Sequence, residues 1–319
     1  ADDKQTDEQK LDKAEIEKRL GDATTKYKTA IPPFDAAKWL NDTWNAGKFS
    51  GVLVLHDEDG GCSFDSTLLA YADSTELQPL ALIRLNLFVR LWKRLRWAIE
   101  DIDRALEVFL PAGIDMPDAT LGGSMKTALV YFAHLKELES LVAVGKNSRA
   151  KLLTLWTNLP TVGKNSLYCQ LFLTRSTLKD DIVFDHPLGM YLSVADVFIR
   201  DHIPALQSAL GLTSDEMIQI LQDGETGDET DIGKAKLSIA NVSMFYRYRL
   251  LATALKISIS DFISLKVMSG LNPFHTLLPG VLNNINDDFA LTHTLTFVRQ
   301  ALQIKNSGVA ISELDYMFR

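Results

Sequence analysis

The sequence predicts a mainly α-helical protein, an irregular bundle of repeated helix-turn-helix pairs with a small β-hairpin near the N-terminus. Two observations indicate helices: the apolar residues from Glu76 onward keep helical spacing, and one short turn pattern recurs along this stretch. A third observation indicates the hairpin, because β-branched runs flank a single acidic, glycine-containing turn. The hydrophobic share of 46% and charged share of 23% are those of an ordinary globular chain.

Two short segments precede the helical body. Residues 1–31 predict a charged N-terminal helix, because few breakers interrupt residues 7–27 and the run stops at Pro32. Residues 32–75 predict a short helix followed by the hairpin. The expected strands are residues 51–56 and 62–71, on either side of an acidic turn.

The remaining residues, 76–319, predict one α-helical body. Its apolar spacing is interrupted only by stretches rich in turn-forming residues, which divide it into helices of ordinary length. The expected loops are residues 111–123, 160–166, 180–189 and 223–233.

The recurring turn pattern joins the end of one apolar helix to the start of the next. A small or hydroxyl residue begins the new helix and an acid follows three positions later, as in the pairs Thr213 with Glu216 and Ser258 with Asp261. This spacing predicts capping boxes, in which a hydroxyl and a carboxylate satisfy backbone amides. The four copies are residues 95–102, 210–217, 255–262 and 309–315.

A helix-turn-helix can also belong to a DNA-binding protein, but the second helices here begin with apolar runs such as residues 217–221. A recognition helix needs a polar, basic face, so the pattern favours packing joints. The net charge of -8 likewise disfavours a nucleic-acid partner, because phosphate binding depends on clustered cations. The densest basic stripe lies inside an apolar segment and consists of Arg84, Arg90, Lys93, Arg94 and Arg96.

Cysteine content and hydropathy bound the class of protein further. Two cysteines, Cys62 and Cys169, are too few for a disulfide framework or a thiolate zinc site, and we expect both to be free. No apolar run approaches the roughly 20 residues that span a bilayer. The first residues lack the apolar core of a signal peptide.

The sequence predicts no catalytic, cofactor-binding or metal-binding residue. The six histidines never occur at the i, i+4 spacing that places two ligands on one helix face, and no nucleophile elbow is present. The repeated dipeptides Asp185-His186 and Asp201-His202 point their two side chains apart on a helix. No enzymatic activity is therefore expected.

Two further motifs invite a ligand and are better explained as turns. The acidic loop 223–231 offers carboxylates to calcium but lacks the spacing of an EF-hand, which favours a solvated linker. The pentapeptide Val-Gly-Lys-Asn-Ser, at 144–148 and 162–166, lacks the upstream glycine of a phosphate-binding loop. Both copies are predicted to be helix-terminating turns.

Four segments together resemble the A component of the Tc insecticidal toxin complexes. The first runs from Arg84 through the Leu91-Trp92-Lys93 triplet to Leu106 and is similar to a characteristic segment of that family. The other three follow in the family's order and are residues 167–173, 240–250 and 311–316. The resemblance covers most of the chain from about residue 82 to the end, and no single segment is diagnostic.

The resemblance implies a non-enzymatic segment of the α-helical shell of a very large subunit. Such subunits form a homo-oligomer around a translocation channel, through which the complex delivers a toxic enzyme into host cells. The implied partners are the rest of the parent subunit and the toxin B and C components, with no nucleic acid, no cofactor and no membrane contact by this segment. The implied location is secreted or extracellular.

The sequence also allows predictions about the extent of the protein, its core residues and an alternative function. The fourth turn is followed by only a few residues, so we expect a fragment or a short relative of a longer protein. The apolar residues at the joints are expected in the core: Trp92, Leu95, Trp97, Leu251 and Leu255. The alternative is a stand-alone α-helical scaffold that binds a protein partner in a groove between repeats.

Overall fold

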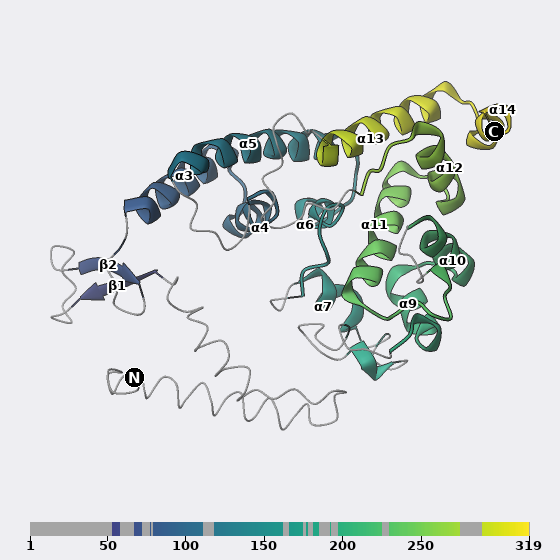
Figure 1. Cartoon of the computed structure of the whole chain (residues 1–319), viewed down its shortest axis with the longest axis horizontal. Coiled ribbons are helices and arrows are strands. Elements are labelled where there is room, and N and C mark those ends of the chain that lie inside the picture. The colour runs from purple at the N-terminus through teal and green to yellow at the C-terminus, as the bar shows by residue number, and fades with distance from the viewer. Residues whose placement is uncertain are drawn as a thin grey trace. The chain divides into compact units, whose positions relative to one another are not determined.

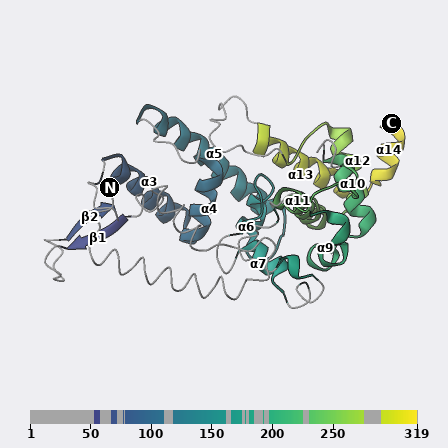
Figure 2. The ribbon, with the colours of Figure 1, turned by 60° about the horizontal axis from the view of Figure 1, so that its bottom comes forward.

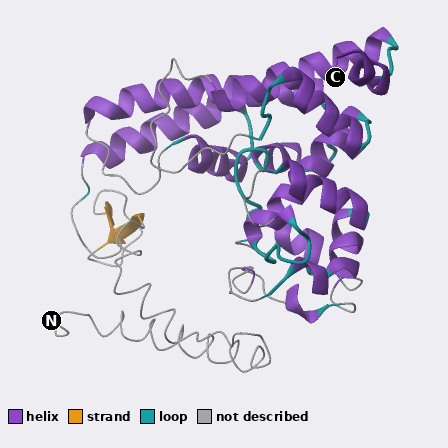
Figure 3. Ribbon diagram, turned by 45° about the vertical axis from the view of Figure 1, so that its right-hand side comes forward, coloured by secondary structure: helices purple, strands orange, loops and turns teal. Residues whose placement is uncertain are grey.

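The fold is mainly helical, which confirms the predicted class, and Figure 3 shows helices throughout the coloured part of the chain. The structure is a computed structural model. It describes residues 53–57, 67–71, 77, 79–110, 118–161, 166–174, 177, 181–184, 192, 197–224, 230–274 and 289–318. The predicted N-terminal helix lies outside these residues, so the proposed boundaries at 31 and 75 stay predictions.

The chain divides into two compact units, residues 1–96 and 97–319. The first contains strands β1 (Leu53–Asp57) and β2 (Thr67–Tyr71), which pair antiparallel with Leu53 opposite Tyr71. These strands overlap the two extended runs expected from the sequence. Helix α3 (Pro79–Leu95) follows, and Leu91 is the one residue of this helix that is buried.

The second unit is built from helices that pack around two centres, which Figures 1 and 2 show from different sides. Helices α4 (Ile99–Phe109), α5 (Asp118–Leu141) and α6 (Ser148–Leu153) pack together. Helix α11 (Ile239–Leu255) contacts α9 (Ile203–Leu210), α10 (Ser214–Asp223) and α12 (Ile259–Ser269). Helix α13 (Phe289–Ser307) touches α5, α11 and α12 and so joins the centres. Helix α7 (Leu167–Phe172) contacts α9, and helix α14 (Ile311–Phe318), which has no buried residue, contacts α12.

Helix α11 is the centre of the larger group. Every residue from Asn241 to Tyr248 is buried, so this part of the helix has no solvent-facing side. A helix buried on all sides belongs to the interior of a larger body. Four aromatic rings, one from α11 itself, form a cluster in which each ring centre lies within 5.5 Å of at least one other: Tyr248, Phe262, Phe274 and Phe297.

A second aromatic cluster forms the core of the α4–α6 group. Phe109 contacts the rings of Phe132 at 5.4 Å and Trp156 at 6.3 Å, and Trp97 lies 5.6 Å from Phe132. The indole N–H of Trp156 donates to the Thr294 hydroxyl at 2.9 Å, so this cluster is tied to helix α13 by a buried hydrogen bond. The bond satisfies an indole donor that burial removes from water.

The four predicted turns share one backbone detail. In each turn, the residue two positions before the small or hydroxyl residue that begins the new helix has a positive φ. These residues are Arg96, Gly211, Lys256 and Gly308. Thr213 and Glu216 form the predicted capping box, and Ser258 accepts a hydrogen bond from the Asp261 amide. At the other two turns the small residue is alanine, which has no side-chain cap to offer. The apolar starts of α10 and α12 are buried, as expected.

Replacing Thr213 with alanine is expected to lower the free energy of unfolding by about 1 kcal/mol, because the Glu216 amide at the start of α10 loses its acceptor. Urea denaturation followed by circular dichroism measures this loss. Thr213→Ser keeps the hydroxyl and is the control, with an expected loss of a few tenths of a kcal/mol at most. Equal losses in both variants would contradict a capping role.

Two details of the body differ from the predictions. Trp92 is 36% exposed, so its assignment to the core is wrong; Leu95 is half-buried, and Trp97, Leu251 and Leu255 are buried. The predicted loop 111–123 ends early because α5 begins at Asp118 and includes two glycines. Glycine costs a helix about 1 kcal/mol, which the packing of the rest of this long helix offsets.

Candidate functional site

The histidines that the structure describes do not form a cluster. His202 Nδ1 pairs with the carboxylate of Asp181, 21 residues earlier, and not with its neighbour Asp201. His134 Nδ1 is buried without a hydrogen-bond partner among the described residues, and the Asp185-His186 dipeptide lies outside them. In the part of the chain that the structure describes, no three His, Cys, Asp or Glu side chains lie close enough to hold a metal ion.

The two turn motifs occupy junctions between helices. In the first copy of the pentapeptide, Asn147 has positive φ and precedes α6. In the second copy, Ser166 caps α7 by accepting from the Cys169 amide at 3.3 Å, while residues 162–165 lie outside the described residues. The first copy lies between the end of α5 and the start of α6, and Asn147 makes no side-chain cap hydrogen bond. In the second copy Ser166 is the N-terminal cap of α7.

The acidic loop begins with an ion pair. Lys266 Nζ on α12 lies 2.8 Å from Asp223 Oδ2 at the end of α10, and the hydroxyl of Tyr248 on α11 donates to the same carboxylate oxygen at 2.6 Å. The side chains of Lys266 and Asp223 are 14% and 12% exposed. Charge and donors are thus satisfied within the cluster, which fits a link between three helices better than a reactive site.

The pair Asp181 and His202 belongs to a second small cluster. The ring of His202 meets the edge of Phe184 at 6.2 Å, and Phe184 stacks on Phe172 at 4.8 Å. The hydroxyl of Tyr168 donates to the Phe184 carbonyl at 3.1 Å. This arrangement fixes the short helix at Ile182–Phe184 against α7 and α9. The polar atoms of the cluster make hydrogen bonds within it.

Arg247 on α11 is a buried cation whose nearest partner is a carbonyl. Its Nη2 donates to the Thr157 carbonyl at 3.2 Å, while its Nε is buried without a hydrogen-bond partner among the described residues. Burial lowers the pKa of this guanidinium to about 10. On the same helix, the Ser243 hydroxyl accepts from the Leu159 amide at 2.8 Å, so α11 holds the loop that follows α6 through polar contacts.

Because of Tyr246, the free energy of unfolding is expected to fall at alkaline pH. Burial raises its pKa above the ordinary value near 10, so the folded state keeps the phenol proton at a pH where the unfolded state loses it. This contribution is fully present below pH 10 and is lost as the pH rises, by up to about 1.4 kcal/mol per pH unit.

Tyr246→Phe removes that loss. Its free energy of unfolding relative to the parent protein is therefore expected to increase between about pH 9 and pH 11. Urea titrations at each pH measure the difference, and the contribution of Arg247 cancels because both proteins carry it. A difference that stays constant over this range would contradict the assignment.

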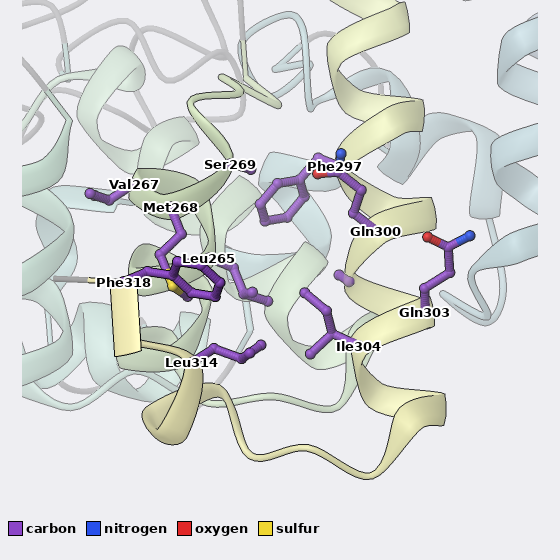
Figure 4. A pocket seen from close by; sticks show the side chains of 11 residues that line it. Leu265, Val267, Met268, Ser269, Phe297, Gln300, Gln303, Ile304, Leu314 and Phe318 are labelled. Carbon is purple, nitrogen blue, oxygen red and sulfur yellow. The ribbon is translucent and has the colours of Figure 1, made fainter. Parts of the chain in front are cut away.

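A cavity of about 720 Å³ lies between α12, α13 and α14, and Figure 4 shows its lining side chains. Apolar side chains such as Phe297, Ile304 and Leu314 form most of its wall, and the polar groups in it are uncharged. Val267 and Phe318 at the cavity are 54% and 76% exposed. The full lining is Leu265, Val267, Met268, Ser269, Phe297, Gln300, Ala301, Gln303, Ile304, Leu314 and Phe318.

This cavity has the size of a small-molecule site but carries no titratable or nucleophilic side chain except the Ser269 hydroxyl, which donates to the Lys266 carbonyl. The side chains that line this cavity can therefore bind mainly through contacts with an apolar surface. Sequence reasoning missed it, because its walls come from three helices and their spacing is the same as that of ordinary core residues.

Comparison with known proteins adds no relative. No protein-family model, curated protein or solved structure matches the chain. Among the described helices, none is long and apolar enough to cross a membrane.

Proposed function

We propose that the chain is a non-enzymatic structural segment of the helical shell of a Tc-toxin-like A subunit. In this proposal the parent protein forms a homo-oligomeric translocation pore, works with B and C components outside the producing cell, and delivers a toxic enzyme into host cells. The support from the sequence is the order of the four segments that resemble the family.

The observation that carries the proposal is the burial of two of the four segments that bear the resemblance, residues 240–250 and 167–173. In residues 240–250 an unbroken run is buried, and in residues 167–173 the side chains of Leu167, Tyr168 and Phe172 are buried. Residues selected for packing favour a structural role, whereas a binding or catalytic motif places side chains at a surface or a cleft.

The repeated turn is part of the same proposal. We take the four turns as copies of one joint that sets successive helices at similar angles, because each pairs a residue of positive φ with an acid five positions later. A shell built from such joints tolerates alanine in place of the hydroxyl cap. The packing of the flanking helices stabilises such a joint more than the hydroxyl cap does.

The cavity between α12, α13 and α14 favours the second candidate, a stand-alone scaffold that binds a protein partner, because exposed apolar side chains border it. The coding sequence around this chain separates the two. A shell segment requires a reading frame of several times this length with channel-forming helices downstream. A frame confined to these residues would contradict the shell and leave the scaffold.

A further inference from the structure

The charged residues of helix α3 are all positive, whereas the chain as a whole is negatively charged. It contains four cations and no acid, and residues 77–99 are free of Asp and Glu although the chain as a whole has a net charge of -8. The four cations are exposed: Arg84, Arg90, Lys93 and Arg94. None of them makes a hydrogen bond or an ion pair with a residue that the structure describes.

This arrangement is unfavourable for the isolated helix. Arg90 lies three residues before Lys93 and four before Arg94, and like charges at these spacings repel one another on a helix. On other helices some cations lie beside an acid, as Arg299 pairs with Glu137 and the part-buried Arg149 with Asp101, whereas α3 itself contains no acid. An external negative surface would relieve the repulsion among the clustered cations of α3.

An apolar stripe runs beside the cations. Leu82, Leu85 and Trp92 are 50%, 41% and 36% exposed, and with Val89 they follow the 3-4-3 spacing of one helix face. At about 100° per residue, Lys93 and Arg90 lie on the neighbouring face. Leu91, the buried residue of α3, lies about 140° around the helix from the centre of the stripe, so the exposed side of α3 consists of an apolar stripe next to a basic one.

We propose that α3 is an interfacial helix that docks on the anionic headgroup surface of a lipid bilayer. Leucine and tryptophan side chains enter the boundary between headgroups and acyl chains, while arginine and lysine side chains bind lipid phosphates and carboxylates. Nucleic acid fits less well, because a duplex offers no apolar surface to the stripe. A protein partner would need an acidic face beside an apolar one, and absence of binding to anionic vesicles would favour it.

This inference goes beyond the proposed function and departs from the expectation that the segment makes no membrane contact. It is independent of the Tc resemblance, since it depends only on the exposure and charge of α3. Because the net charge of the chain is negative, general electrostatic attraction to an anionic surface is not expected. Binding has to come from this helix.

Flotation of the whole chain with lipid vesicles tests the proposal. One vesicle preparation is phosphatidylcholine alone, and the other contains about one third phosphatidylserine. The expected result is binding to the anionic vesicles only, weakened in about 0.5 M salt, where screening shortens the reach of surface charge. Absence of binding to anionic vesicles would overturn the proposal.

Two variants and a matched control locate the site. Arg90→Glu/Lys93→Glu/Arg94→Glu is expected to lower the vesicle partition coefficient by about 100-fold or more, and Leu82→Ser/Leu85→Ser by about tenfold. The control, Lys146→Glu/Lys234→Glu/Lys236→Glu, changes the net charge equally at exposed positions outside α3 and is expected to bind nearly as the parent does. Circular dichroism confirms that each variant is folded.

Three results would contradict the docking of α3 on lipid. Equal losses in the α3 variant and the control would assign the effect to net charge. Unchanged binding in the α3 variants would place the contact elsewhere. Retention on heparin or duplex DNA without vesicle binding would assign α3 to a polyanion other than lipid.

Discussion

Asp223→Ala is expected to lower the free energy of unfolding by about 3 kcal/mol, because Lys266 stays charged in a largely buried place and loses the carboxylate that neutralises it. This value is at the low end for a broken buried ion pair, since both side chains keep a small exposure to water. The hydroxyl of Tyr248 loses its acceptor in the same variant. Chemical denaturation followed by circular dichroism measures the loss.

The partner substitution separates the charge effect from packing. Lys266→Met leaves Asp223 with its hydrogen bond from Tyr248 and retains the aliphatic contacts of the lysine, so its expected loss is smaller, about 1 to 2 kcal/mol. In Asp223→Leu/Lys266→Met no buried charge remains, and most of the stability should return. A double variant as unstable as Asp223→Ala would show that the ion pair is not the cause.

Trp97→Ala is expected to cost about 3 to 5 kcal/mol, the usual range for removing a buried aromatic side chain. Trp97 is 6% exposed, packs on Phe132, and lies under the Arg149 guanidinium at 4.4 Å from the ring centre. Arg149 also pairs with Asp101 at 2.9 Å, so the variant loosens the junction of α4, α5 and α6. Thermal and urea unfolding report the change.

The chain offers a matched control five residues earlier. Trp92→Ala removes the same side chain from an exposed position on α3, so its expected cost is below about 1 kcal/mol. Comparing the two removes any general effect of losing a tryptophan. Similar losses in the two variants would contradict the assignment of Trp97, and not Trp92, to the core.

Local features of the fold were predictable from the sequence. The capping box at Thr213 and Glu216 depends on two residues three positions apart, and the buried starts of α10 and α12 follow from their apolar runs. Helical periodicity also predicts the mainly helical class. In each case the physical cause acts within one or two turns of helix, so the sequence contains the complete signal.

Features that depend on distant contacts were not predictable. Trp92 and Trp97 occupy equally apolar surroundings in the sequence, and only the packing of whole helices decides which one is buried. Asp223 and Lys266 are 43 residues apart, and nothing local marks them as partners. Walls contributed by three separate helices likewise hide the cavity near Phe297 from sequence analysis.

We propose above that this chain is a packing segment of a larger helical shell. Electron microscopy of the purified product of the complete reading frame, together with its mass in solution, tests the claim most directly. The expected result is a closed homo-oligomer with a helical outer wall around a central channel. A compact monomer of about the mass of this chain would contradict it.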